Sequence, residues 1–272
     1  TGLFRTTVYG GYHRGLTTAV LRNEDFPAED EIGDNFNIGL RSSAIKGVDL
    51  EVAGFYQLFQ NFQYGESFSA VTGDREFGRA EKAEVKGIEL AGRVNSQPYV
   101  GGSLNFFAEG NYTYAQGKLT QANRTYEDED DNVIVDYGAY NGRRIPEVPW
   151  HVAALTLGVE GTTGWRWNAS TTWTYRGSFF TDAANTAYGL GGEYECGEEA
   201  DNICEVEEAG EGGDVPSVWL LSARFNLDIG NTGASVFVSG TNLLDEFYIT
   251  DREDGMKPGL GRTVWTGFKY KF

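Results

Sequence analysis

Hydrophobic and polar residues alternate along much of the chain. In 165–176 one set of every second residue is mainly aromatic or apolar and the other set is polar: Trp165, Trp167, Ala169, Thr171, Trp173 and Tyr175 against Arg166, Asn168, Ser170, Thr172, Thr174 and Arg176. A period of two predicts a β-strand with one apolar and one polar face. The same period recurs at 48–57, 88–95, 218–228 and 262–272.

The pattern predicts ten strands, many of them long enough to cross a membrane at a tilt, which takes about 9–11 residues. They are expected at 3–14, 35–44, 47–64, 78–95, 102–118, 148–160, 164–180, 217–229, 233–248 and 261–272. Short connections alternate with long ones at 15–34, 65–77, 119–147, 181–216 and 249–260. Short turns at one end and long loops at the other are typical of outer-membrane β-barrels. We therefore predict an all-β, antiparallel transmembrane sheet with almost no helix, whose first and last strands are edges.

Charge and composition narrow the class of protein further. The chain has 40 acidic and 22 basic residues, a formal charge of −18, which argues against nucleic acid as a partner. Many acids lie in the expected long loops, ten of them between Glu193 and Asp214. No apolar run of about 18 residues is present, which excludes a membrane-spanning helix. We find no nucleophile elbow, phosphate-binding loop or catalytic set, so we do not expect an enzyme.

Five short motifs occur in order along the chain. They are Asn37-Ile38-Gly39-Leu40-Arg41, Lys86-Gly87-Ile88-Glu89-Leu90, Arg144-Ile145-Pro146-Glu147-Val148-Pro149-Trp150-His151, Ser239 to Tyr248 (SGTNLLDEFY), and Lys257 to Thr263 (KPGLGRT), ahead of a terminal Tyr270-Lys271-Phe272. Together they resemble TonB-dependent outer-membrane receptors, and the stretch from Asn242 to Arg252 is most similar to the ferric citrate branch. The terminal aromatic residue resembles the signal read by the outer-membrane assembly machinery.

The resemblance carries expectations about the whole protein. Such receptors have a barrel of roughly 22 strands filled by a plug, and residues 1–272 match the C-terminal part of the barrel, with the plug absent from this chain. The family implies the outer membrane of a Gram-negative bacterium, contact with lipid and lipopolysaccharide, and a TonB-type energy transducer acting through the plug. The implied function is import of a ferric chelate, a siderophore or ferric citrate. A passive porin and a cation-binding surface barrel stay open as alternatives.

An anionic ferric chelate needs cationic groups near the outer rim or on the lumen wall. The candidate ligand-binding residues are His13, Arg14, Tyr140, Arg143, Arg144, Arg176 and Arg252. Arginines also line any polar barrel wall, so each could instead be structural.

Two further sites lie in the loops. Asp128, Asp130 and Asn132 have the oxygen spacing of an EF-hand, but Val133 replaces the glycine and Ala139 the bidentate glutamate, which leaves at most a looser site for Ca²⁺ or Mg²⁺. Cys196 and Cys204 share one acidic loop, where a disulfide is favoured over a metal site because no histidine lies near.

The alternation also predicts which side chains face lipid. They are Trp165, Trp167, Trp173, Tyr175, Trp219, Phe225, Phe268 and Tyr270, whereas Arg166, Arg176, Arg224 and Lys269 are expected to face the lumen.

Overall fold

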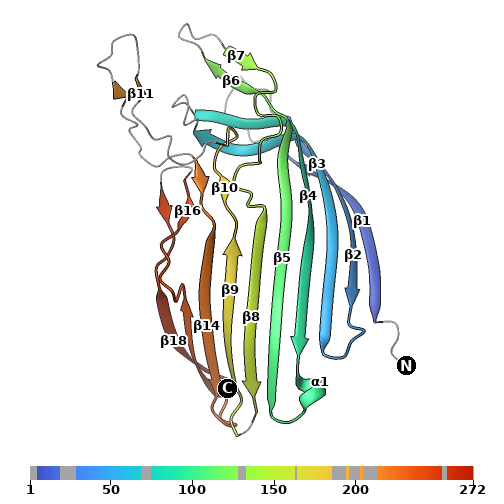
Figure 1. The fold of residues 1–272 in the computed structure, drawn as a ribbon, viewed down its shortest axis with the longest axis vertical. Coiled ribbons are helices and arrows are strands. Elements are labelled where there is room, and N and C mark those ends of the chain that lie inside the picture. Colours follow the sequence, from blue (N-terminus) through green and yellow to red (C-terminus); the bar gives the residue numbers. More distant parts are fainter. Residues whose placement is uncertain are drawn as a thin grey trace.

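A computed structural model describes residues 5–18, 29–68, 75–127, 133–162, 164–185, 194–195, 203–204, 213–252 and 256–271. Its dominant feature is one curved sheet of ten strands (Figure 1). The strands are β1 (Thr6–Thr17), β2 (Glu31–Ser42), β3 (Val48–Phe68), β4 (Arg75–Asn95), β5 (Leu104–Gln121), β8 (His151–Gly161), β9 (Trp167–Arg176), β14 (Val218–Asp228), β15 (Ala234–Thr241) and β18 (Thr263–Tyr270).

The strands follow one another across the sheet, and every neighbouring pair is antiparallel. In the described part of the chain, β1 and β18 are the two edges, each paired on one side. The ten predicted strands, their order and the open sheet are therefore confirmed. Short turns close one end, and the long connections rise from the other, which we call the loop end (Figure 1).

One predicted boundary is wrong by seven residues, whereas the other strand ends shift by four residues or fewer. The strand expected at 233–248 ends at Thr241, because the next residue begins a turn. Asn242 and Asp245 both have positive φ, 49° and 60°, a conformation that does not continue a strand. The side-chain amide of Asn242 replaces the missing ladder: Nδ2 donates to the carbonyl oxygens of Glu246 (2.9 Å) and Leu260 (3.1 Å), and Oδ1 accepts from the Glu246 N–H.

Four small two-stranded sheets lie in the connections at the loop end. They are β6 (Arg124–Glu127) with β7 (Val133–Asp136), β10 (Phe179–Phe180) with β13 (Asp214–Val215), β11 (Tyr194–Glu195) with β12 (Ile203–Cys204), and β16 (Ile249–Asp251) with β17 (Lys257–Pro258). None was predicted as a separate sheet, although β10 lies within the strand expected at 164–180. At the other end one short helix, α1 (Gln97–Val100), forms a turn. Over the described residues no helix is long and apolar enough to cross a membrane.

The register separates two faces of the sheet. One face, here the apolar face, carries Trp167, Trp173, Tyr175, Trp219, Phe225, Phe268 and Tyr270 in adjoining cross-strand positions. On the other, polar face, the Arg224 guanidinium carbon lies 4.7 Å from the Phe237 ring centre, and Lys269 stands opposite Ser235. Trp165 and Arg166 precede β9, so the strand register assigns neither a face. The alternation thus predicted the two faces correctly within the strands.

The packed core lies at the loop end. Leu119, Ala122, Tyr140 and Ile145 are buried with alanines of β4 and the 183–184 turn. Gly117 permits this packing, since a Cβ there would lie 3.1 Å from Ile145 Cδ1. The segment after Gly142 can therefore run close against β5 and carry its side chains to the strand ends.

Candidate functional site

The candidate site begins with Arg144, which follows this close-packed segment. Its guanidinium carbon lies 4.6 Å from the ring centre of Trp150 and 5.3 Å from that of Phe180. Its Nη2 donates a 2.7 Å hydrogen bond to the Ser178 carbonyl oxygen. Burial among these groups lowers the pKa of Arg144, although an arginine stays charged at any physiological pH.

The backbone of Arg144 is held from both sides. Its neighbours pair with β5, as the Leu119 N–H donates to the Arg143 carbonyl oxygen (2.9 Å) and the Ile145 N–H to that of Gly117 (3.3 Å). Asn185 then clamps it: Oδ1 accepts from the Arg144 N–H (2.6 Å) and Nδ2 donates to the Arg144 carbonyl oxygen (3.0 Å). Arg144 is therefore a fixed element of the rim.

Arg176 is a second fixed arginine, at the end of β9. Its guanidinium carbon lies 5.0 Å from the Phe179 ring centre. Nη2 donates to the carbonyl oxygen of Ile249 (2.6 Å) and Nη1 to that of Thr250 (3.4 Å), both in β16. Phe179 and Ile249 are buried together with Val215. Arg176 thus connects the main sheet to the β16–β17 pair.

Three more predicted site residues lie in the same region. Arg252 follows β16 and is buried, and Tyr140 is buried in the core beside Leu119 and Ile145. Arg143 is the exposed member. We use the name arginine rim for Arg143, Arg144, Arg176 and Arg252.

An acidic residue accompanies the rim. Glu147 has a positive φ of 61°, and its N–H donates to the Phe180 carbonyl oxygen at 2.7 Å. Burial and the nearby Asp251 carboxylate raise the pKa of Glu147, while Lys257 opposes the shift. The rim therefore presents mixed charge, with its cations in the majority.

The structure does not bring His13 and Arg14 to this rim. Both lie on β1, an edge strand that β2 to β5 separate from β8. His13 stands opposite Asn35 on the polar face. Arg14 lies on the apolar face, where it forms a bidentate ion pair with Asp34 (2.7 and 2.8 Å). Arg14 shares the face of Tyr12 and not that of His13, because side chains two positions apart in a strand point to the same face. The sequence alone could have given this assignment.

Several predicted sites lie outside the described residues. Asp128, Asp130 and Asn132 are among them, as is Cys196, so the divalent-ion site and the disulfide to Cys204 stay predictions. Within the described ranges no group of three or more His, Cys, Asp or Glu side chains is placed to hold a metal ion.

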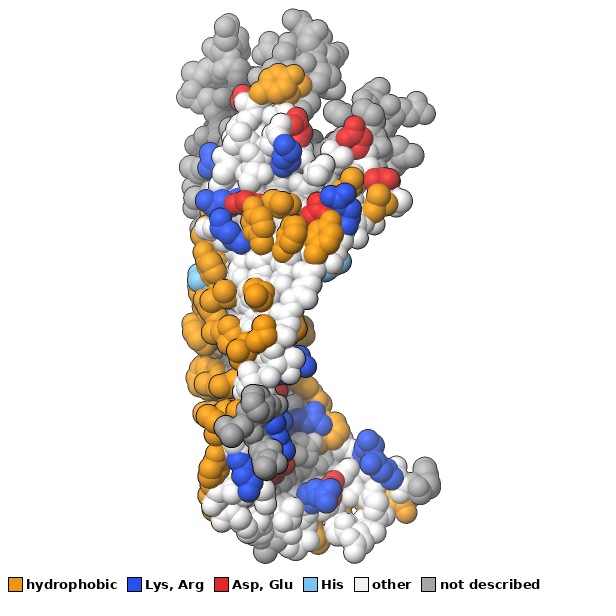
Figure 2. Space-filling model, turned by 90° about the vertical axis from the view of Figure 1, so that its right-hand side faces the viewer, with side chains coloured by type: hydrophobic (Ala, Val, Ile, Leu, Met, Phe, Trp, Pro, Cys, Tyr) orange, Lys and Arg blue, Asp and Glu red, His pale blue; other side chains and the backbone are white. Residues whose placement is uncertain are grey.

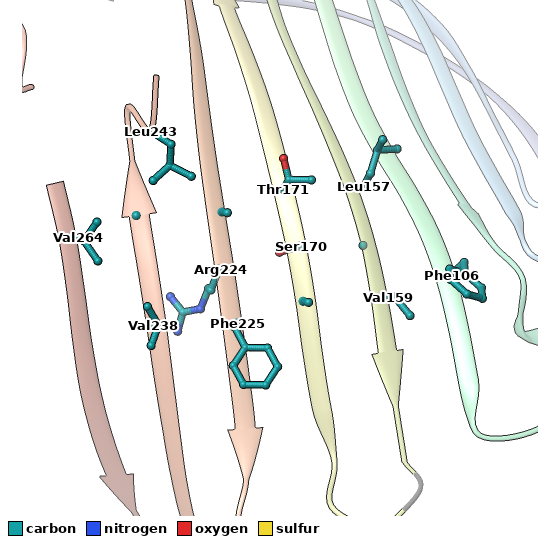
Figure 3. Close-up of a pocket in the computed structure, with 14 residues that line it drawn as sticks. Phe106, Leu157, Val159, Ser170, Thr171, Arg224, Phe225, Val238, Leu243 and Val264 are labelled. Atoms are coloured by element: carbon teal, nitrogen blue, oxygen red, sulfur yellow. The ribbon is translucent and has the colours of Figure 1, made fainter. Parts of the chain in front are cut away.

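A hollow of about 670 Å³ lies elsewhere, on the apolar face of β8, β9, β14 and β15 (Figure 3). Ala169, Ala223 and Gly240 form its floor, and large apolar side chains such as Phe106, Leu157, Phe225 and Val264 surround it. The one charged residue that lines it, Arg224, holds its guanidinium against the Phe237 ring on the polar face, so we place the candidate site at the arginine rim.

Chemically, the rim can accept an anion at the exposed guanidinium of Arg143. The Nε atoms of Arg144 and Arg176 and the Nε1 atom of Trp150 have no hydrogen-bond partner among the described residues, but they are buried and closed to an outside ligand. Guanidinium groups match carboxylates in shape and bind them with two parallel hydrogen bonds. Sequence reasoning identified the arginines but missed Trp150, Phe179, Phe180 and Asn185, which position them. Trp150 could have been found from its motif, whereas Asn185 lies in a long loop with no local signal.

Solved structures share this fold. The unliganded ferric citrate transporter FecA matches 99% of this chain with 36% of its own length, at 20% identity and a TM-score of 0.68. The siderophore receptor PiuA from Acinetobacter baumannii matches 97% with 33% of its length, at 17% identity and a TM-score of 0.65. The copper transporter OprC matches 98% with 37% of its length, at 16% identity and a TM-score of 0.59. No curated protein matches.

The chain thus spans about a third of the length of these structures. At such identities they establish the fold, and the three described functions concern transport or reception, with no enzyme among them. The family model for the TonB dependent receptor-like β-barrel matches residues 3–243, nearly the whole described sheet. The chain belongs to the TonB-dependent receptor β-barrel family.

Proposed function

We propose that this chain is the C-terminal part of the barrel of an outer-membrane receptor that imports a ferric chelate, of siderophore or ferric citrate type, in a TonB-dependent way. The family supports an outer-membrane location in a Gram-negative bacterium and a TonB-type energy transducer, which would act through a plug outside this chain. The observation that carries the ligand class is the arginine rim, with its cations set against aromatic faces at the loop end.

The residues of the arginine rim have different roles. Arg144 and Arg176 are held by carbonyl oxygens and aromatic rings, so they set the shape and the positive potential of the rim. Arg143 is exposed, so it is the member free to meet a carboxylate of the chelate directly. Tyr140 supports the turn from the core.

The acidic loops do not offer a primary site for such a ligand, because like charges repel in a partly desolvated cleft. Ca²⁺ or Mg²⁺ bound there, and lipopolysaccharide phosphates bridged by these ions, would order the loops without contacting the chelate. Cys196 and Cys204 would close a disulfide in the same region.

Growth under iron limitation tests the function. A strain lacking the full-length receptor is supplied with one ferric chelate at a time, and iron uptake is measured with and without an uncoupler of the proton-motive force. We expect loss of uptake of one chelate, restored by the wild-type gene and much less by an Arg143→Ala gene. Unimpaired uptake of every ferric chelate would reject the importer. Uptake that continues with the uncoupler would identify a passive porin.

A further inference from the structure

Charge is distributed unevenly over the polar face of the sheet. Across β1 to β5 this face carries acids, among them Glu51, Glu89 and Glu109. Figure 2, viewed from the β1 side, shows hydrophobic side chains along one side of the curved sheet and a hollow on the other. An anion that enters from the loop end along β1 to β5 would therefore meet like charge.

The polar face of β8, β9 and β14 is different. In these strands, as the structure describes them, the register places no Asp or Glu side chain on this face between Arg176 and Arg224. We call this surface the acid-free strip. Its residues are Val152, Ala154, Thr156 and Gly158 on β8, Thr174, Thr172 and Ser170 on β9, and Val218, Leu220 and Ser222 on β14.

The strip is neutral and most of its side chains are small. Thr156 Oγ1 lies 2.8 Å from Thr172 Oγ1, so these two hydroxyl groups bind each other within the wall. Glu109, which stands opposite Thr156 on the neighbouring β5, pairs with Arg93 at 3.2 Å. The strip therefore gives an anion a path along the wall on which the adjoining acid is already paired.

Arg224 lies at the end of the strip that is farther from the arginine rim. It is six residues beyond Val218, which stands opposite Arg176, so it lies about 20 Å from the rim at about 3.4 Å per residue. Its guanidinium carbon lies 4.7 Å from the Phe237 ring centre, and its Nε donates to Asn226 Oδ1 at 2.9 Å. The side chain is exposed and forms no ion pair with a side chain that the structure describes. Arg224 is thus a positioned cation whose charge the described residues do not neutralise.

Acids return just beyond Arg224. Glu160 is one level closer to the short turns, opposite Asn168, and accepts a 2.6 Å hydrogen bond from Asn105 Nδ2. Asp228 lies four residues beyond Arg224 on β14. On these strands Arg224 is therefore the last cation that an anion from the loop end meets before the acids.

We propose that Arg224 is a second anion site of the receptor, and that an anionic ferric chelate passes from the arginine rim along the acid-free strip to reach it. The inference rests on the proposed function, which supplies the anion. A surface that carries one sign of charge raises the local concentration of a substrate of the opposite sign. The guanidinium of Arg224 can bind a pair of carboxylate or catecholate oxygens of the chelate, and Phe237 and Asn226 hold it in place for this contact.

Thiol chemistry in the full-length receptor tests the site independently of the identity of the chelate. Ser222→Cys places a thiol one level from Arg224 toward the loop end, in a receptor whose native cysteines are serines. Its modification rate in energised cells is compared for an anionic sulfonate and a cationic trimethylammonium methanethiosulfonate. We expect Arg224→Gln to lower the anionic-to-cationic rate ratio by at least about fivefold, the effect of one unit charge at about 4 Å in water. Arg224→Lys should keep the ratio. The matched control, Lys269→Gln, removes a cation of the same face outside the strip and should leave the ratio unchanged.

Citrate alone serves as a competing anion, and iron uptake connects the site to transport. Citrate should slow modification of Ser222→Cys, and Arg224→Gln should raise the citrate concentration needed by about fivefold. In the strain lacking the receptor, supplied with ferric citrate and ferric siderophores one at a time, the Arg224→Gln gene should restore slower uptake than the wild-type gene. Chelate binding to cells treated with the uncoupler should stay as in the wild type, because the arginine rim is intact.

Three results would overturn the site. An unchanged rate ratio in Arg224→Gln is the first, and a lower melting temperature in the same variant would then show that Arg224 pairs with a carboxylate of the plug. The second is a Ser222→Cys thiol that neither reagent modifies, which would show that the strip is closed, and the third is a lack of protection by citrate. If the wild-type gene restores uptake of no chelate while the rate ratio still responds to Arg224, the proposed function fails and the anion site stands.

Discussion

The guanidinium of Arg144 stacks on the ring of Trp150, with its carbon 4.6 Å from the ring centre. Both residues come from one connection between β5 and β8, and the same guanidinium binds the Ser178 carbonyl oxygen beyond β9. One side chain therefore joins two connections of the loop end. This contact explains why an arginine chosen as a ligand candidate also has a structural role.

Replacing Arg144 should loosen the loop end. Arg144→Ala removes a cation–π contact and a hydrogen bond to a charged donor, together about 1–3 kcal/mol of local stability. We expect faster hydrogen exchange at 143–150 and 178–180 and weaker chelate binding. Arg143→Ala is the control, because its side chain is exposed, and it should weaken binding while exchange stays unchanged. Equal exchange in both variants would contradict the structural role of Arg144.

Asn185 should be sensitive in two ways. Asn185→Gly removes the bonds to the Arg144 N–H and carbonyl oxygen, each worth about 0.5–1.5 kcal/mol. Asn185→Ala also places an alanine at φ 54°, which costs about 1 kcal/mol more. Exchange at the Arg144 amide should therefore increase from wild type to Gly to Ala. An alanine variant as protected as the glycine variant would show that the backbone conformation costs nothing here.

A side chain at Gly39 should displace the ring of Tyr9. A Cβ at Gly39 would overlap the Tyr9 ring, whose hydroxyl donates to Glu51 at 2.7 Å. Gly39→Ala should destabilise the sheet by about 1–3 kcal/mol, as overpacking does. In a Tyr9→Ser background the same change should cost much less, which a thermal double-mutant cycle would measure. Gly15→Ala, with open space at its Cβ, should be neutral.

The free energy of unfolding should fall as pH rises above the usual pKa of a glutamate side chain. The pKa of Glu147 is raised in the folded protein, so the folded state binds this proton more tightly than the unfolded state. The favourable contribution is complete below the unfolded pKa and is lost as pH rises through the folded pKa. Glu147→Gln should flatten this dependence and raise the melting temperature at neutral pH. A stronger fall of stability with rising pH in this variant would contradict the predicted direction of the Glu147 effect.

Alternation predicted the sheet because a strand with one face in an apolar environment must repeat every two residues. It could not show that Asn242 ends β15, since the replacement bonds come from Leu260, which is distant in sequence. The arginine rim was predictable as a set of cations, but their fixed geometry depends on Asn185 and Phe180, which reach Arg144 only in the folded chain. Arg14 is the opposite case, because counting in steps of two along its strand would have placed its side chain on the apolar face before the structure was known.

The turn at Asn242 also affects how the sheet resists a pulling force. A closed barrel resists stretching around its circumference through the hydrogen-bond ladder between each pair of strands. Between Thr241 and Ile249 that ladder is replaced by the amide of Asn242 and by Asp245, which accepts from the Arg262 N–H at 2.9 Å and pairs with its side chain at 3.2 Å. The tensile strength of the wall there rests on these two side chains and on one backbone hydrogen bond, from the Gly259 N–H to the Tyr248 carbonyl oxygen (2.8 Å). A pulling force applied across β15 and β18 should separate the strands at this level first.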